Sequence, residues 1–402
     1  MSFLTHEPES MVLSFEWKTD VIVSQNGNEQ RIAVRQEPRQ FASLNYLADS
    51  NEEVQFWKKE MVSKMDNGWQ VPLWHEAVDI TAAITASDTT VSADFTKMDD
   101  ELGRVMLLIH PDGETHELIT VTLPRTSTTA TLATGTIQNS YPLEGTRLIP
   151  VLRSYIDNNS SYTPMTNNAA AVSANFTGWE YPALDGKSAP SLPTHQSNLT
   201  INPGSLTRYL LDRRPLSDGS SEVFEQKITR LDYDHAILLK SAQPEANIIS
   251  GRSYLMDDVD ERQFWKNFLG TIMGQQKSFY TQTWRHDMTV STQPAQGGTS
   301  FVVLDDSSPD GIWDATLSHS ELAIYTADGT IQYVTIDPAT TIDNGNGTHT
   351  VSFLPALTNT PDGSNVLRVS FLELVRLASD TVEFELGHLH HKVSFAVRTI
   401  EA

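Results

Sequence analysis

One four-residue stretch constrains the fold of this chain more than any other feature. Gln55–Lys58 reads Gln-Phe-Trp-Lys, and the same four residues recur at Gln263–Lys266, 208 positions later. Only 8 of the 402 residues are tryptophan, so a match that includes one is seldom a coincidence. We therefore expect the same helix to be built twice. In each copy the tryptophan should anchor the helix on a β core, with the glutamine and the lysine facing outward.

The residues around each copy favour a helix. Short polar residues and acids at 49–53, and a run of acids at 257–261, are typical of a helix start. In the first copy, apolar residues spaced for one helix face follow: Val54, Trp57, Met61 and Met65. Asn67-Gly68 then predicts the end of this helix.

Further matches extend the repeat beyond the helix and predict a tandem duplication, because their offset rises along the chain and never reverses. In chain order the matched segments are Glu29–Ile32 with Glu225–Ile228, Trp74-His75 with Trp284–His286, Ile109–Glu114 with Ile324–Thr330, Gly145–Leu152 with Gly363–Leu374, and Ala171–Ser173 with Lys392–Ser394. A repeat of this length is far longer than a solenoid repeat.

The rest of the pattern is β. Segments 11–17, 20–23, 29–35 and 39–47 alternate or run apolar with β-branched residues, and Asn26-Gly27 is a hairpin signal. Threonine-rich alternating segments then continue to about residue 153. We predict a mainly β fold with a few helices (β-rich α+β). It is a tandem duplication of a β-sandwich or barrel unit carrying one helix, each unit followed by a small all-β domain.

This pattern divides the chain into five parts. The expected parts are a first β unit with its helix (1–80), a small all-β domain (81–153), an extended connector with part of the second unit (154–220), a second β unit with its helix (221–292), and a second small all-β domain with the C-terminal strands (293–402). The connector is predicted because polar, Pro, Ser and Gly residues dominate that stretch.

Composition excludes several classes of function. A net charge of −23 argues against a general nucleic-acid binder, although an acidic surface can line a passage through which DNA slides without sticking. The absence of cysteine excludes disulfides and thiolate chemistry. No apolar run is long enough for a membrane span, and the first residues lack the features of a signal peptide. We expect a protein made in a cytoplasm and not exported by a standard signal.

No motif predicts an enzyme, a cofactor or a metal site. His388 and His390 would share one face of a strand and could bind zinc or copper, but no further ligand is signalled nearby, so a polar strand is the preferred interpretation. The carboxylate clusters at 99–101, 257–261 and 305–306 show no glycosidase-like pair. Asp343–Thr348 resembles a calcium loop but lacks the glutamate at loop position 12, so we predict a hairpin turn.

The first unit resembles bacteriophage minor tail proteins of the distal-tail or tail-tip (baseplate) group. The residues that carry this resemblance are, in order, the 17–23 strand, Asn26–Ala33 with its Gly-x-Glu-Gln-Arg, Pro38-Arg39, the Phe56-Trp57 helix and Val71–Trp74. The resemblance implies that the units at 1–80 and 221–292 are similar to tail-tube units. It also implies a virion component of the phage tail, assembled in the host cytoplasm.

The same resemblance implies a structural function. Such a protein forms a ring at the distal end of the tail tube and connects the tube to the host-recognition apparatus. Two similar units in one chain would allow a trimer with pseudo-six-fold symmetry, or a hexamer, contacting the tail tube and other tail-tip or hub proteins, with DNA only in transient passage. Two alternatives remain open. They are a carbohydrate-binding or depolymerising tail protein, and a β-rich bacterial assembly protein unrelated to phage.

Overall fold

The structure, a computed structural model, describes most of the 402-residue chain. The residues it does not describe are 1, 4–6, 25–27, 64–67, 99–104, 114, 123–125, 167–168, 180–191, 197–206, 217–221, 227, 234–235, 242–245, 295–296, 305–318, 338–339, 359–365, 388–389 and 401–402. Strands make up 56% of the structure and helical segments 11%, which confirms the predicted mainly β fold with few helices. Within the described residues, no helix has the length and apolar character that a membrane crossing requires.

A long antiparallel hairpin begins the first half. Its strands β2 (Ser10–Val23) and β3 (Glu29–Ala48) pair from Ser10↔Asn45 to Val23↔Glu29, as the alternating sequence predicts, while the Asn26-Gly27 tip lies outside the described residues. The other strands of this half's sheet are β12 (Ala170–Gly178) beside β3, β10 (Arg147–Ile156) and β11 (Ser161–Pro164) beside β12, β4 (Gly68–Pro72) beside β10, and β1 (Ser2–Phe3) parallel to β4.

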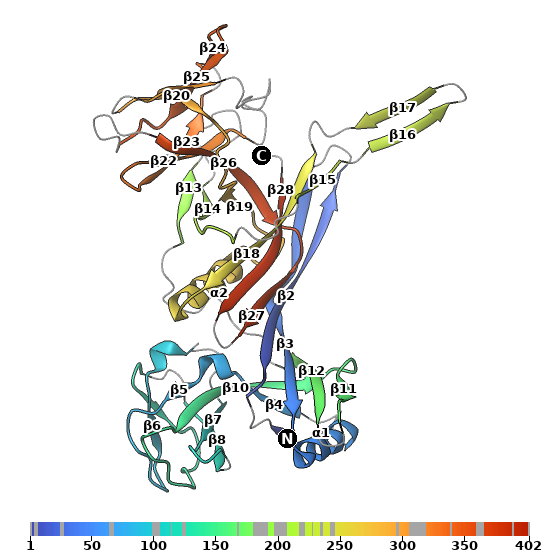
Figure 1. Cartoon of the computed structure of the whole chain (residues 1–402), viewed down its shortest axis with the longest axis vertical. Coiled ribbons are helices and arrows are strands. Elements are labelled where there is room, and N and C mark those ends of the chain that lie inside the picture. The colour runs from blue at the N-terminus through green and yellow to red at the C-terminus, as the bar shows by residue number, and fades with distance from the viewer. Residues whose placement is uncertain are drawn as a thin grey trace.

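The second half contains a sheet with the same pairings. Its strands are β15 (Glu222–Glu225), β18 (Asn247–Met256), β28 (His391–Thr399), β27 (Thr381–Leu386), β26 (Val366–Leu377), β19 (Phe279–Gln282), β14 (Thr207–Leu211) and β13 (Thr194–Gln196). A separate hairpin, β16 (Ile228–Tyr233) with β17 (Ala236–Ser241), follows β15. Figure 1 shows this hairpin projecting from the sheet near the end of the long β2–β3 hairpin.

Each half carries one helix on its sheet. Helix α1 (Asn51–Ser63) buries Val54 and Trp57, and helix α2 (Val259–Ile272) buries Trp265. The side chain of Asp258 caps α2 by accepting a 2.8 Å hydrogen bond from the Glu261 backbone N–H, as expected of its acidic start. The predicted anchoring role of both tryptophans is confirmed, since Trp57 is 5% exposed and Trp265 is fully buried.

Each half also carries a small all-β domain with its own core, so two satellite cores flank the main one. The first contains a 3-10 helix, η1 (Trp74–Glu76), at its entry, then β5 (Val78–Asp79), β6 (Thr90–Ser92), η2 (Phe95–Lys97), β7 (Val105–Ile109), β8 (His116–Thr120) and β9 (Thr129–Thr131). The second contains β20 (Val290–Thr292), β21 (Ser300–Leu304), β22 (Glu321–Thr326), β23 (Ile331–Ile336), β24 (Ile342–Asp343) and β25 (Thr348–Leu354). The predicted 343–348 hairpin turn is confirmed by the β24–β25 pairing.

Equivalent strand pairs of the two halves share the same register. Tyr46 pairs with Val172 across β3–β12, and Tyr254 pairs with Val393 across β18–β28. Each tyrosine contacts the tryptophan of its own helix, with ring centroids 5.1 Å apart for Trp57 and 4.5 Å for Trp265. The helices and these strands therefore recur together at the offsets of 208 and 221 seen in the sequence.

The registers also correct one sequence match. Glu225 lies in β15, which pairs with β18 as β2 pairs with β3, so the equivalent of Glu225 is Glu16 and not Glu29. The Glu-Gln dipeptide misled because a short polar match carries little register information. The structure also places β11 and β12 in a stretch that the sequence pattern assigned to a connector, because β11 is short and polar and the buried face of β12 includes the small residues Ala170 and Ala174.

Candidate assembly surface

The two halves meet through one antiparallel strand pair, β2 with β27. The register runs from Met11↔Leu386 to Glu16↔Thr381, and it makes the two sheets continuous. Phe15 is 1% exposed and packs edge-to-face on Phe384, with ring centroids 5.3 Å apart. The buried residues on both sides belong to one hydrophobic core, so the two halves pack against each other through a continuous apolar interface.

A buried arginine fixes the far end of the junction. Arg376 of β26 is 3% exposed and contacts both carboxylate oxygens of Glu29 in β3, at 2.7 and 2.8 Å. Burial would raise the pKa of Glu29, but the hydrogen bonds and charge of Arg376 outweigh it and lower that pKa. This two-point contact sets the angle of the β2–β3 hairpin against the second half.

A buried lysine holds the other end of the junction. Lys266, within the second Gln-Phe-Trp-Lys, reaches Glu76 of η1 at 2.9 Å, and both side chains are buried. The prediction that this lysine faces outward is therefore wrong for the second copy, because the first half covers that face of α2. Burial raises the pKa of Glu76, yet the charge of Lys266 and the hydrogen bond from His75 lower it well below its usual range.

A cleft of about 180 Å³ opens beside this ion pair, between the two halves. The first half contributes Glu7, Pro8, Glu9, Met11, Trp74 and His75 to its lining, and the second contributes Leu386, Gly387 and His391. Burial lowers the pKa of His391 to about 4, and the positive charge of Arg262 acts in the same direction. Burial also lowers the pKa of His75, so the junction disfavours the protonated form of both histidines.

The outermost strands of the combined sheet are exposed. In the described part of the chain, β15 pairs only with β18 and β11 pairs only with β12. Val223 and Phe224 on β15 are 52% and 66% exposed, which is unusual for apolar side chains on an unpaired strand edge. Phe56 and Val62 on α1 are also exposed, at 41% and 88%.

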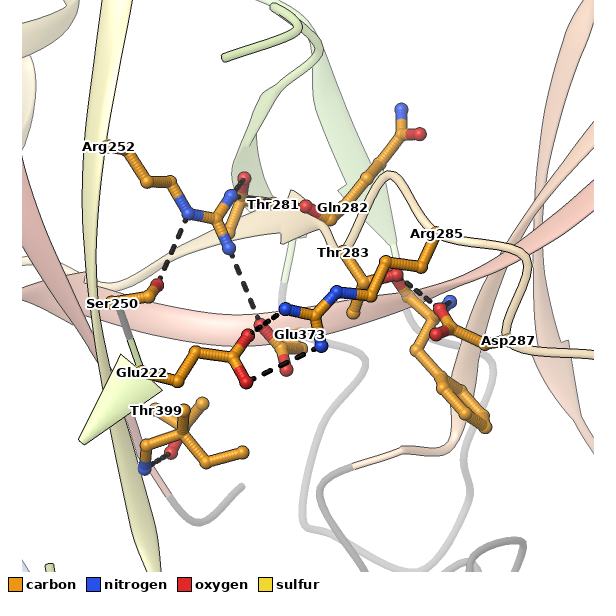
Figure 2. A network of polar contacts seen from close by, with 12 residues as sticks. Glu222, Ser250, Arg252, Thr281, Gln282, Thr283, Arg285, Asp287, Glu373 and Thr399 are labelled. Atoms are coloured by element: carbon orange, nitrogen blue, oxygen red, sulfur yellow. Dashed lines mark hydrogen bonds and ion pairs between the residues drawn. The ribbon is translucent and has the colours of Figure 1, made fainter. Parts of the chain in front are cut away.

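A polar network secures β15 to the rest of the second half (Figure 2). Glu222 of β15 receives hydrogen bonds from the guanidinium group of Arg285. Beneath it, buried Arg252 lies 3.5 Å from Glu373 and donates to Thr281 at 2.5 Å. Burial raises the pKa of Glu373 despite the opposing charge of Arg252. In the same network the Thr283 hydroxyl donates to the carboxylate of Asp287. The physical effect of these contacts is to position the exposed strand.

Of the two histidines considered as metal ligands, only His390 lies in the part of the chain that the structure describes. His388 lies outside the described residues, and His390 is exposed in the turn before β28 and not on a strand, because β28 begins at His391. No group of three or more His, Asp or Glu side chains in the described ranges could hold a metal ion. The carboxylate clusters at 99–101 and 305–306 lie outside those ranges.

The sequence reading missed one repeated contact. The guanidinium of Arg147 lies 5.2 Å from the Trp74 ring centroid, and that of Arg368 lies 5.4 Å from the Trp284 ring centroid. These arginines stand at equivalent register positions of β10 and β26. Their offset of 221 is the one already seen for Ala171–Ser173 with Lys392–Ser394, so the signal was present in the sequence.

No protein-family model matches the chain, and no curated protein sequence matches it significantly.

Proposed function

We propose that this chain is a structural component of a bacteriophage tail tip or baseplate. It forms a ring at the distal end of the tail tube and connects the tube to the host-recognition apparatus. The observation that carries the proposal is the recurrence of the same strand pairings in both halves, joined head to tail by the β2–β27 pair. A chain that joins two like units in this way already contains one junction of a ring.

The two similar halves would also let the ring match partners of different symmetry. Three chains provide six similar units, so a trimer offers pseudo-six-fold symmetry to a six-fold tube and three-fold symmetry to the parts beyond it. The net charge of −23 is compatible with DNA passing through such a ring without binding. This assignment rests on the resemblance of residues 17–74 to distal tail proteins and on the repeated pairings.

The tryptophans give little support to the alternative, a carbohydrate-binding protein. Stacking on a sugar needs an exposed aromatic face, and the tryptophans that are buried in the structure are Trp17, Trp57, Trp69, Trp74 and Trp265. Trp179 is 47% exposed, and Trp284 is half-buried with the Arg368 guanidinium over its ring. We therefore favour the structural function.

The number of copies per virion tests the proposal. Quantitative mass spectrometry of purified particles, calibrated against the major tube protein, should give three copies of this chain per tail. Six or twelve copies would overturn the trimer, and absence from the particle would overturn the function. A density map of the tail tip should place the chain where the tube ends.

A further inference from the structure

The order of the strands across the junction has a direct structural consequence. Neighbouring strands run β11, β12, β3, β2, β27, β28, β18 and β15, and every adjacent pair is antiparallel. The second four repeat the first four in the same order. In the part of the chain that the structure describes, β11 and β15 are thus the two free ends of one sheet, and they are the strands equivalent to β27 and β2.

The matching registers show which residues of β15 and β11 are equivalent to those of β2 and β27. Phe224 pairs with Ile248, and Phe15 pairs with Gln40. Because Gln40 and Ile248 are 208 positions apart and therefore equivalent, Phe224 takes the place of Phe15. Tyr162 pairs with Val172 as Phe384 pairs with Val393, so Tyr162 takes the place of Phe384. An aromatic residue therefore stands at each position that builds the Phe15–Phe384 contact of the junction.

We propose that β15 of one copy pairs antiparallel with β11 of a second copy of this chain, repeating between chains the β2–β27 pairing within the chain. The inference rests on the proposed ring and names the surfaces that close it. Phe224 then packs near Tyr162 of the next copy. Because one free edge meets the other, the contact is heterologous and continues from copy to copy until the sheet closes on itself.

Burial favours this partner. Phe15 is 1% exposed in the junction, whereas its equivalent Phe224 is 66% exposed in the single chain. The transferred register sets Glu222, whose carboxylate accepts from Arg285 of its own chain, opposite Tyr162, and Lys58 on α1 lies 5.3 Å from the Tyr162 ring centroid. Closure would also remove two exposed strand edges, which otherwise invite unspecific pairing.

A disulfide trap tests the register directly. The chain has no cysteine, so introduced cysteines have no competitor. The junction pair Ser14↔Glu383 corresponds to Val223 opposite Ser161, and directly opposed antiparallel residues lie within disulfide reach. The full-length chain carrying Val223→Cys and Ser161→Cys should oxidise to covalent closed trimers, seen on non-reducing gels and by native mass spectrometry.

Three matched variants control the trap. Ser14→Cys with Glu383→Cys should give a disulfide inside one chain and no increase in mass, which confirms that the position tolerates the bond. Val223→Cys with Tyr162→Cys should trap far less, because adjacent strand residues face opposite sides of the sheet. Val223→Cys alone should give no trimer. If Val223→Cys alone forms dimers as fast as the double variant forms its products, β15 pairs with β15 of another copy. That result would overturn the proposal.

A second measurement does not depend on a disulfide. Phe224→Asp should weaken self-association of the full chain about tenfold or more, because it places a charge at the centre of the contact. Ile342→Asp is the matched control, since Ile342 is 59% exposed on β24 in the second small domain, and it should leave association unchanged. Equal effects of both variants, or a wild-type chain that stays monomeric and is not trapped, would overturn the proposal.

The outcome also separates this inference from the proposed function. Trapped trimers from a protein that is absent from phage tails would support the contact and overturn the function. Three copies per tail without any trapping would support the function and overturn the contact.

Discussion

The two helices that carry Gln-Phe-Trp-Lys have the same anchor but different surroundings. Trp57 and Trp265 are both buried against a tyrosine of the neighbouring strand. The residue before the tryptophan is 41% exposed in the first copy (Phe56) and 4% exposed in the second (Phe264). Identical local sequence therefore determines the helix and its buried inward face, whereas tertiary neighbours determine whether the outward face is buried or exposed.

This difference identifies a surface built for contact. On the outward face of α2, η1 of the first half covers Lys266 and Arg213 of its own half covers Phe264, whereas nothing in the described chain covers α1 in the same way. A face that is covered in one copy of a unit and exposed in the other indicates a missing neighbour of the same kind. Substitutions at equivalent residues of the two halves test whether this difference in surroundings affects stability.

The largest expected effect is at the shared anchor. Trp265→Ala should destabilise the protein by about 5 kcal/mol and Trp57→Ala by about 3 kcal/mol, the range for large-to-small changes at buried aromatics. Trp265 should cost more because it is fully buried and contacts Phe268, Phe395 and Tyr254, while α1 has an open outer face. Urea unfolding followed by tryptophan fluorescence and by circular dichroism measures both. A larger cost at Trp57 would contradict the comparison.

The next effect separates the two lysines. Lys266→Met should destabilise by about 3 kcal/mol, because it removes the cation that contacts buried Glu76. Lys58→Met should cost less than about 1 kcal/mol, since Lys58 is exposed and its contact with the described residues is a cation–π contact with Tyr162. Both are measured as shifts of the urea midpoint.

A double variant shows whether the ion pair is the cause. Adding Glu76→Gln to Lys266→Met should recover much of the loss, because no buried charge is then left without its partner. A double variant as unstable as the sum of the single variants would assign the cost to packing and not to charge.

Local features of this fold were predictable from sequence. The Asp-Gly turns illustrate this, because Gly113 and Gly329 adopt positive φ of 72° and 83° at equivalent hairpins, as their sequences require. The apolar spacing around Trp57 likewise predicted which helix face is buried. These features depend on residues close together in the chain, so the sequence pattern contains them.

The junction was not predictable in the same way. β2 pairs with β27 across most of the chain, and no local pattern states which distant strand completes a sheet. Glu76 and Lys266 each look like ordinary surface residues until the halves are placed together. The candidate surface was missed for the same reason, since the exposure of Phe224 is meaningful only beside the burial of Phe15.

The smallest expected effect concerns pH at the junction. Burial, followed by the charge of Arg262, lowers the pKa of His391 from 6.5 to about 4, and burial also lowers the pKa of His75 against the opposing charge of Glu76. At His391 the unfolded chain therefore binds more protons than the folded chain between pH 6.5 and about 4, so the contribution of His391 to stability falls as the pH is lowered through this window, whereas the raised pKa of buried Glu373 acts in the opposite direction. Glu76 does not reverse the trend, because its lowered pKa keeps it ionised there.

The urea midpoint of the wild-type chain should thus be lower at pH 5 than at pH 7, and His391→Gln should reduce that difference by removing one of the groups that titrates unequally. His286→Gln, at an exposed histidine of the second half, should keep the wild-type difference. If His391→Gln and His286→Gln behave alike, the cleft histidine gains its proton in the folded state. His391 would then be more accessible to solvent than the buried Lys266–Glu76 pair beside it indicates. The contact between the two halves would in that case be a poorer guide to the contact between copies.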